Sequence, residues 1–457
     1  MNRTLALALA LVACDDNGVP KTGGGEAKTK PAAGVAKALL KTKDGPQKRP
    51  VRHEAPAPVA LREDEPATYR TTSAHIYWKN LRGQIKELKR LVGSQPKNVL
   101  RHRQLGFAQH QMAFLTGRLE GHTAALASLD VAIELGGGSF DNRLARAKTR
   151  QALHDFSGAL DDLKFVLDKK PKHGKAVELK NSILWSLGRY DEAMPKLRAA
   201  AFSPRTTAHA AVAHLLLETG EIEKARKAYA AAVGGFKGVN PASVAWLEVQ
   251  RGVTYLDAGQ WVEAKRLFNA ADDRLNEFTL AEEHLAETHA LLGDKETAAA
   301  LYGRVIDRSG DPVFRQALAV VLESQGKQAE ADAERAKALQ GFEERLKSHP
   351  AAVWQEAAEF FFATGDDNRA LDLATKNIGL RQDAASLALL ARVQAKAGKK
   401  AESIATIRKA LATPIRTAGL FSAAHEVFTV AGNADEAGDW LAKARALNPK
   451  VQKFTVE

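Results

Sequence analysis

Residues 258–264 read Ala-Gly-Gln-Trp-Val-Glu-Ala, and the pattern in this stretch is a glycine five residues before a small residue. The same pattern recurs at residues 187–193, 219–225, 292–298, 325–331, 364–370, 397–403 and 431–437. Ala125 and Ala159 occupy the small position in two further stretches that lack the glycine. From Ala125 onward the small residues follow at steps of 34, 34, 32, 39, 34, 33, 39, 33 and 34 residues. The chain therefore contains ten copies of one repeated unit.

One copy shows the physical sense of the pattern. Gly252 lies in the first expected helix, where its missing side chain lets a second helix approach, and Gly259 ends that helix in the left-handed conformation that glycine tolerates. Ala264, Phe268 and Ala271 follow at spacings of four and three, which places a small, a large and a small residue on one helix face. A single unit cannot bury this face, so its neighbours must cover it.

The period and the internal pattern resemble the tetratricopeptide repeat, a helix–turn–helix unit of about 34 residues. The resemblance covers residues 97–449 and implies an all-α fold, a right-handed superhelix (α-solenoid) of about ten repeats. Aromatic residues make up only 6% of the chain. That low share, with abundant alanine, favours close helix packing over a β-rich core.

Several copies depart from the family pattern. Arg335 stands where the seventh copy should have a large apolar residue, and Asn377 replaces a small residue in the eighth. The first copy carries an insertion before Ala125. The two 39-residue steps imply longer helices or loops near residues 234–241 and 341–350, where we expect the superhelix to bend.

Short segments flank the array. Apolar residues with helical spacing predict a capping helix within residues 71–96, which ends at Gln95 and Pro96. Residues 450–457 form a C-terminal tail, so we expect no second domain with a separate activity. The residues with that spacing are Tyr77, Trp78, Leu81, Ile85, Leu88 and Leu91.

The first residues have the order of a secretory signal, with Arg3 before an apolar run from Thr4 to Ala13. Ten apolar residues would span about 15 Å as a helix, half of a bilayer core, so the run is too short to cross a membrane. The end of the run, Leu11-Val12-Ala13-Cys14, resembles the lipobox of bacterial lipoproteins, and Cys14 is the only cysteine in the chain.

The lipobox resemblance implies a signal peptide over residues 1–13, cleavage between Ala13 and Cys14, a diacylglyceryl group on the Cys14 thiol and an N-acyl chain on the new amino group. The alternative is an ordinary signal peptide with an incidental cysteine. We expect a lipid anchor in a bacterial envelope that faces the periplasm. The outer membrane is favoured over the inner membrane, although Asp15 after the cysteine resembles an inner-membrane retention signal in enteric bacteria.

Residues 14–70 are rich in Pro, Gly, Lys and Ala with almost no aromatic residues. Such a segment cannot bury enough apolar surface to offset its ordering entropy, so we predict a disordered tether between the anchor and the array. The formal net charge of the whole chain is +12. Nearly all of this excess lies in the first quarter of the sequence, which makes a basic N-terminal region on a balanced body.

No motif for catalysis or cofactor binding stands out. His209 and His214, like His284 and His289, are five residues apart, which places them on different helix faces, unlike the i,i+4 spacing of a helical zinc site. We found no glycine-rich phosphate loop, nucleophile elbow or HExxH motif, and the repeat glycines are explained as helix ends. The sequence therefore predicts a non-enzymatic protein without a cofactor, a metal or a small-molecule substrate.

Arrays of the resembling family bind an extended peptide or a helix in a concave groove lined by the first helix of each repeat. The resemblance implies that seven side chains face such a groove. For each of them, the alternative is that the side chain is buried in the core of its own repeat. A lysine-and-asparagine clamp for a terminal carboxylate is not evident. The seven residues are Trp185, Val249, Val253, Leu256, Glu283, Glu287 and Phe362.

A basic stretch near the predicted capping helix is a candidate contact for lipid headgroups, lipopolysaccharide phosphate or an acidic partner, at about 1 kcal/mol per well-placed charge. The alternative is a solvated helix face. Nucleic acid is not expected as a partner of a secreted lipoprotein. The residues are Lys79, Arg82, Lys86, Lys89, Arg90, Lys97, Arg101 and Arg103.

These features predict a scaffold that binds envelope proteins of a multiprotein machine. The chain resembles the repeat lipoproteins of gliding motility and type IV pilus assembly. Regulators of outer-membrane protein assembly or of peptidoglycan synthases, which share the architecture, are an alternative. A subunit of a polysaccharide-export or cell-wall enzyme is a hypothesis of another class, for which Glu283 and Glu287 are the only candidate carboxylate pair.

Overall fold

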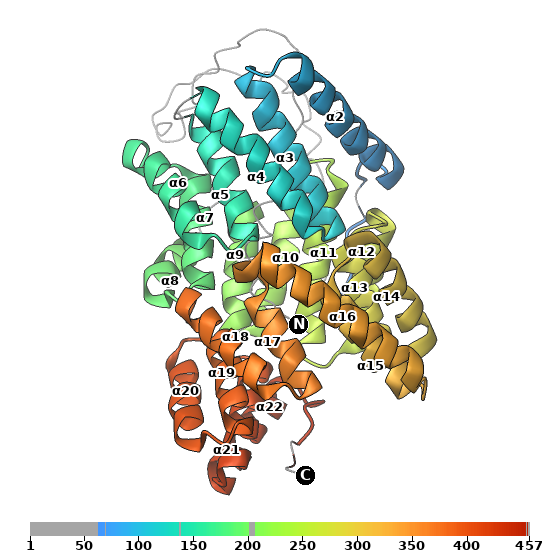
Figure 1. The fold of residues 1–457 in the computed structure, drawn as a ribbon, viewed down its shortest axis with the longest axis vertical. Helices are drawn as coiled ribbons and strands as arrows, with labels where there is room; N and C mark the ends of the chain where they lie inside the picture. Colours follow the sequence, from blue (N-terminus) through green and yellow to red (C-terminus); the bar gives the residue numbers. More distant parts are fainter. Residues whose placement is uncertain (1–62, 69, 137–138, 201–205, 454, 456–457) are drawn as a thin grey trace, which may run out of the picture.

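The structure is a computed structural model, and it describes residues 63–68, 70–136, 139–200, 206–453 and 455. Within these residues it contains twenty-one α-helices and no strand (Figure 1). The helix α2 (Ala74–Ser94) precedes ten antiparallel helix pairs, each with a helix A and a helix B. The predicted all-α fold of about ten repeats with an N-terminal helix is confirmed.

The ten pairs follow one another along the chain, and each packs on the next. Repeats 1 to 5 are α3 (Val99–Thr116) with α4 (Leu119–Gly136), α5 (Phe140–Ala152) with α6 (Phe156–Lys169), α7 (Gly174–Ser186) with α8 (Tyr190–Ala199), α9 (Thr206–Glu218) with α10 (Ile222–Gly234), and α11 (Pro241–Leu256) with α12 (Trp261–Arg274). Repeats 6 to 10 are α13 (Thr279–Leu291) with α14 (Lys295–Ser309), α15 (Pro312–Ser324) with α16 (Gln328–Ser348), α17 (Pro350–Thr364) with α18 (Asp367–Leu380), α19 (Ala384–Lys396) with α20 (Lys400–Ala412), and α21 (Ala418–Ala431) with α22 (Ala434–Leu447).

The packing inside one repeat follows the sequence pattern. A Cβ atom added to Gly252 in α11 would lie only 2.4 Å from Cε1 of Phe268 in α12, so the glycine is what allows the two helices to approach. Ala264, Phe268 and Ala271 are fully buried. Gly259 ends α11 with φ of +73°, as its place in the pattern predicts.

The turn between the two helices of a repeat uses the left-handed conformation throughout the array. In repeat 2, which lacks the glycine, His154 takes that position with φ of +57°. The eight glycines of the motif all have positive φ: Gly188, Gly220, Gly259, Gly293, Gly326, Gly365, Gly398 and Gly432. The turn therefore keeps its geometry even where the residue that favours it is absent.

The irregular copies are accommodated locally. The insertion before Ala125 adds residues at the start of α4, and the second long step makes α16 a helix of 21 residues. Asn377 is buried and donates to Gln355 Oε1 and Ser386 Oγ, at 3.2 and 2.9 Å. Arg335 stays near the surface, where it pairs with Glu323 and Asp332.

The superhelix closes on itself after six repeats. The turn inside each of repeats 1 to 4 lies beside the segment that leads into helix A six repeats later, and α2 meets repeat 6 in the same way. The residues in these contacts are 190 to 198 positions apart in the sequence. The contacts join Trp78 Nε1 to the Asn276 carbonyl (2.8 Å), Arg118 Nε to the Arg308 carbonyl (2.6 Å), His154 Nδ1 to the Ala351 carbonyl (3.2 Å), the Ala384 amide to the Tyr190 hydroxyl (2.9 Å) and the Arg416 amide to the Glu218 carbonyl (2.8 Å).

Because successive turns touch, the interior is divided into cavities between the two turns that stay partly open to solvent, rather than one continuous groove. Figure 1 shows the early repeats, coloured blue to green, toward one end of the molecule and the last repeats, coloured red, at the other. All sixteen residues of α11, in the middle of the array, are buried.

A segment without helix or strand, residues 63–68 and 70–72, begins with a turn, lies against α11 and is called the strap below. Arg251 donates to the carbonyls of Glu63 and Glu65 at 2.9 and 2.7 Å, and the Ala67 amide donates to Glu248 Oε1 at 2.7 Å. The Thr72 amide donates to the Val239 carbonyl just before α11 begins. Residues 63–68 and 70 of the strap fall inside the segment 14–70 that was predicted to be a tether, so the body of the protein holds the last part of that segment. Residues 71 and 72 fall in the range predicted for the capping helix, which begins only at Ala74.

The remaining sequence predictions on the N-terminal region, the signal peptide, the cleavage between Ala13 and Cys14, the lipidation of Cys14 and the tether up to residue 62, lie outside the described residues. Of the helices that the structure does describe, none combines the length and the apolar character that crossing a membrane requires. At the other end of the chain, Lys450 and Val451 pack back on the array, on Trp261 and on the core of repeats 9 and 10.

Candidate interaction site

Two cavities lie inside the superhelix, between residues of its first turn and residues of its second. The first, of about 230 Å³, is enclosed by repeats 1 and 2 on one side and repeats 6 to 8 on the other. The second, of about 690 Å³, lies between repeats 3 to 5 and repeats 8 to 10. Glu359 in α17 lines both, so the two cavities meet at this helix.

The second cavity combines an aromatic wall with an excess of acidic groups. Trp185 and Tyr190 pack edge to face at 4.8 Å, and burial raises the pKa of the Tyr190 phenol far above its usual value. The only basic side chains among the lining residues are Arg392 and Lys453, and Arg392 pairs with Glu426 at 2.6 Å. The acidic lining residues are Glu218, Asp257, Glu359, Asp383 and Glu426.

The structure separates the seven predicted groove residues. Trp185 lines the second cavity and Glu283 the first. Val249, Val253 and Leu256 are at most 7% exposed and belong to the central core, so a partner does not reach them in this structure. For these three the alternative placement, inside the core, is the one observed, because α11 is covered on all sides.

Two further predicted groove residues lie close to charged neighbours. Phe362 is half-buried, and Arg392 and Lys396 lie over its ring at 4.8 and 5.0 Å from the centroid. Glu287 lies one helical turn after Glu283 on α13, and its side chain is 31% exposed.

His284 joins this carboxylate pair, which the spacing of histidines alone did not predict. Its Nδ1 lies 3.4 Å from Glu283 Oε2 and 3.3 Å from Glu287 Oε2. His289, the residue that the sequence pairs with His284, instead contacts Asp294 at 2.9 Å. The polar cluster on α13 is therefore formed by Glu283, His284 and Glu287, and not by the two histidines that the sequence pairs.

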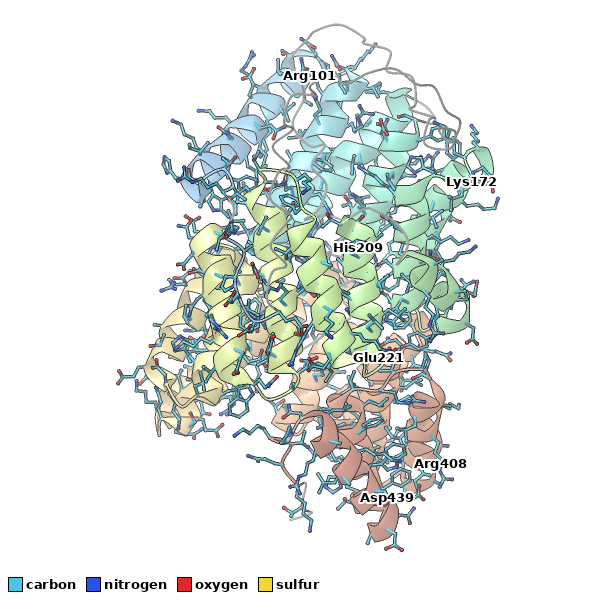
Figure 2. The ribbon with its side chains drawn as sticks, turned by 180° about the vertical axis from the view of Figure 1, so that it is seen from behind. Arg101, Lys172, His209, Glu221, Arg408 and Asp439 are labelled. Carbon is cyan, nitrogen blue, oxygen red and sulfur yellow. The ribbon has the colours of Figure 1, made fainter. Side chains whose placement is uncertain are left out.

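Other buried histidines lie at the same internal surface. His110 and His122 contact each other at 3.1 Å between their Nδ1 atoms, and His122 and His154 line the first cavity. His214 lines the second, whereas His209 on the same helix is half-buried and is labelled in Figure 2. No spacing in the sequence marks these residues, because the surface forms only when the two turns meet.

The predicted basic surface is divided between paired and exposed charges. Lys79, Lys86, Lys89 and Lys97 are exposed. The arginines contact neighbours: Arg82 pairs with Glu277, Arg90 with Glu87 and Arg103 with Asp141, and Arg101 donates to Gln104. Figure 2 shows Arg101 at the end of the molecule that lies opposite Arg408 and Asp439.

The stacked helix pairs define a class of protein, the α-solenoids. Residues 144–210, which run from α5 into α9, match the tetratricopeptide repeat family. The described part of the chain is an all-α superhelix of helix pairs with the architecture of tetratricopeptide-repeat arrays, and arrays of this kind present extended surfaces to other proteins. In this respect the protein is an interaction scaffold.

Comparison with solved structures gives, among others, the crystal structure of the APC/C hetero-tetramer Cut9-Hcn1. The two chains are 13% identical, the TM-score is 0.32, and the similarity covers 82% of this chain and 92% of that chain. A comparison with curated proteins finds no match.

Proposed function

We propose that this protein is a non-enzymatic, lipid-anchored scaffold in the periplasm of a bacterium, which binds envelope proteins of a motility machine, either gliding or type IV pilus assembly. The observation that carries the scaffold role is the second cavity, because it is large, internal and lined by both aromatic and acidic side chains. Such a lining suits a partner segment that is extended and basic.

The proposed lipid anchor and the proposed role in a motility machine are supported by features of the sequence. Cys14 ends the apolar run at the position of a lipidated cysteine, and the chain resembles the repeat lipoproteins of motility machines. Of the two membranes we favour the outer one. The exposed lysines of α2 belong to the basic N-terminal region and would face anionic headgroups or an acidic partner.

The anchor is tested by fractionating cells that make Cys14→Ala. We expect this variant to leave the membrane fraction, and mass spectrometry of the mature wild-type N-terminus to show an acylated Cys14. A variant that stays fully membrane-bound, or an unmodified wild-type cysteine, contradicts the lipid anchor.

The scaffold role is tested by crosslinking in cells with a charge reversal inside the cavity. Glu359→Lys places a positive charge where both cavities meet, and we expect it to abolish the crosslinks that wild type makes to defined envelope proteins. Glu436→Lys is the matched control, because the Glu436 side chain on α22 is 42% exposed, pairs with Arg408 and does not line either cavity. Equal crosslinking in both variants contradicts binding in the cavity, and loss of motility only in Glu359→Lys supports the assigned machine.

A further inference from the structure

Three metal-ligating side chains lie together on α13, independently of the interaction role proposed above. They are Glu283, His284 and Glu287, and one donor atom from each lies within 4.8 Å of the others. Glu283 and His284 are buried and Glu287 is partly buried. Within the described residues this is the one group of at least three such side chains that could hold an ion.

We propose that Glu283, His284 and Glu287 form a binding site for one divalent transition-metal ion, such as Zn²⁺. The spacings explain how one helix supplies all three ligands. Glu283 and Glu287 are one turn apart, and His284 is three residues before Glu287, so the three side chains share one side of α13.

The distances agree with a shared ion. Ligands that bind zinc at about 2.0–2.1 Å in tetrahedral geometry are about 3.3 Å from one another. His284 Nδ1 lies 3.4 Å from Glu283 Oε2 and 3.3 Å from Glu287 Oε2. The three donor atoms lie within 4.8 Å of one another, so the two histidine–carboxylate distances already fit a shared ion, and rotation of the partly exposed Glu287 side chain would bring the two carboxylates closer together.

The imidazole is held in place by its surroundings. The His284 ring stacks on Phe268 at 4.9 Å and 15°. Phe268 is fully buried and packs directly on the backbone at Gly252. A ligand ring whose orientation is fixed by packing loses little freedom when it binds a metal.

Charge favours a divalent ion at this position. Two carboxylates brought together in a buried site repel each other, and an ion of charge +2 compensates both. The nitrogen donor favours zinc and related metals over Mg²⁺ and Ca²⁺, which prefer oxygen ligands. Glu283 also lines the first cavity, and its volume of about 230 Å³ leaves room for water molecules as further ligands.

The test uses the untagged full-length chain in metal-free buffer. We expect equilibrium dialysis against Zn²⁺ to give about one ion per chain, Co²⁺ to produce a visible absorption band of a nitrogen- and oxygen-ligated site, and excess Mg²⁺ not to compete. Zn²⁺ should raise the thermal midpoint, because it binds the folded chain. Glu287→Gln should weaken Zn²⁺ binding by at least about tenfold.

Glu287→Gln is the main variant because its side chain is partly exposed, and circular dichroism checks that it folds. Asp294→Asn is the matched control, since it alters the His289–Asp294 pair at the end of the same helix and should keep full Zn²⁺ binding. Cys14→Ser excludes binding by the thiol. The proposal is overturned if wild type binds no Zn²⁺, if Glu287→Gln and His284→Gln bind as wild type does, or if only Cys14→Ser loses the ion.

Discussion

At Gly252 the backbone of α11 lies against the ring of Phe268, and a methyl group there would overlap the ring. Gly303 in α14 also lies inside a helix, but nothing lies within 4 Å of the place that its Cβ would occupy. Replacement of glycine by alanine should therefore change the stability of the protein in opposite directions at the two positions.

We predict that Gly252→Ala destabilises the protein by about 1–3 kcal/mol through overpacking, whereas Gly303→Ala stabilises it by up to about 1 kcal/mol through helix propensity. Urea unfolding of both variants measures the difference. Equal effects at the two sites would show that close helix approach is not what requires Gly252.

The buried histidines make stability depend on pH. Burial lowers the pKa of His122 to about 4, of His154 to about 3 and of His214 to about 4. In the unfolded chain these groups take up a proton near pH 6.5, so between pH 6.5 and about 4 the unfolded state binds more protons than the folded state. Stability is therefore lost as the pH falls through this window.

We predict that the free energy of unfolding decreases from pH 7 to pH 5, by at most about 1.4 kcal/mol per histidine for each pH unit below 6.5. His214→Gln should reduce the slope, because glutamine does not titrate. Denaturation curves at several pH values measure it. A slope that His214→Gln leaves unchanged contradicts the assignment to this residue.

At the scale of an element, a buried ion pair in α11 holds the strap, together with Arg266 and Arg274 of α12, which contact Asp64 and the Ala67 carbonyl. Arg251 and Glu248 lie 2.6 Å apart and are at most 1% exposed, and each also bonds to the strap. Burial raises the pKa of the Glu248 carboxyl, although Arg251 acts in the opposite direction. Removal of one partner leaves the other in a buried site without its opposite charge.

We predict that Arg251→Met costs about 3–5 kcal/mol of stability, and that the double variant Glu248→Leu with Arg251→Met is more stable than Arg251→Met alone. Urea unfolding of wild type and of the single and double variants measures these stability differences. Limited proteolysis reports release of the strap. A double variant no more stable than the single one would show that the unpaired carboxylate is not the cause of the loss.

The helix pairs were the part of the fold that the sequence predicted well. The period placed each helix pair, and Gly259 ends its helix as expected because both signals act within one repeat. The strap was not predicted, since the composition before residue 70 is that of a disordered segment. Its order comes from Glu248 and Arg251, about 180 residues later, and no local pattern records such a contact.

At the scale of the whole molecule, the contacts between successive turns decide which surfaces a partner can reach. Val249 was predicted to face a groove because an isolated repeat of this pattern would expose it, but the closed array buries it. The closure depends on the rotation from one repeat to the next. That rotation arises from helix packing angles and is not encoded in the repeat length.

We predict that Trp78→Ala, which removes the hydrogen bond to the Asn276 carbonyl and a buried ring, speeds amide hydrogen exchange in residues 276–282 at the start of repeat 6. Trp440→Ala is the control, because Trp440 packs on Phe421 within repeat 10 and should leave that segment unchanged. Exchange measured by mass spectrometry distinguishes the two, and equal protection in both would contradict closure by this contact.

The six-repeat offset also has a consequence for how such a chain can change during evolution. In an open array, a repeat gained or lost by duplication or deletion alters only its two neighbours. Here a single copy gained or lost between repeats 3 and 9 would bring Tyr190 opposite the wrong loop and would shift the partners of other contacts between the turns. The contacts between successive turns therefore constrain the number of repeats in this array. We expect related chains to vary in their loops and at their ends rather than in the number of internal repeats.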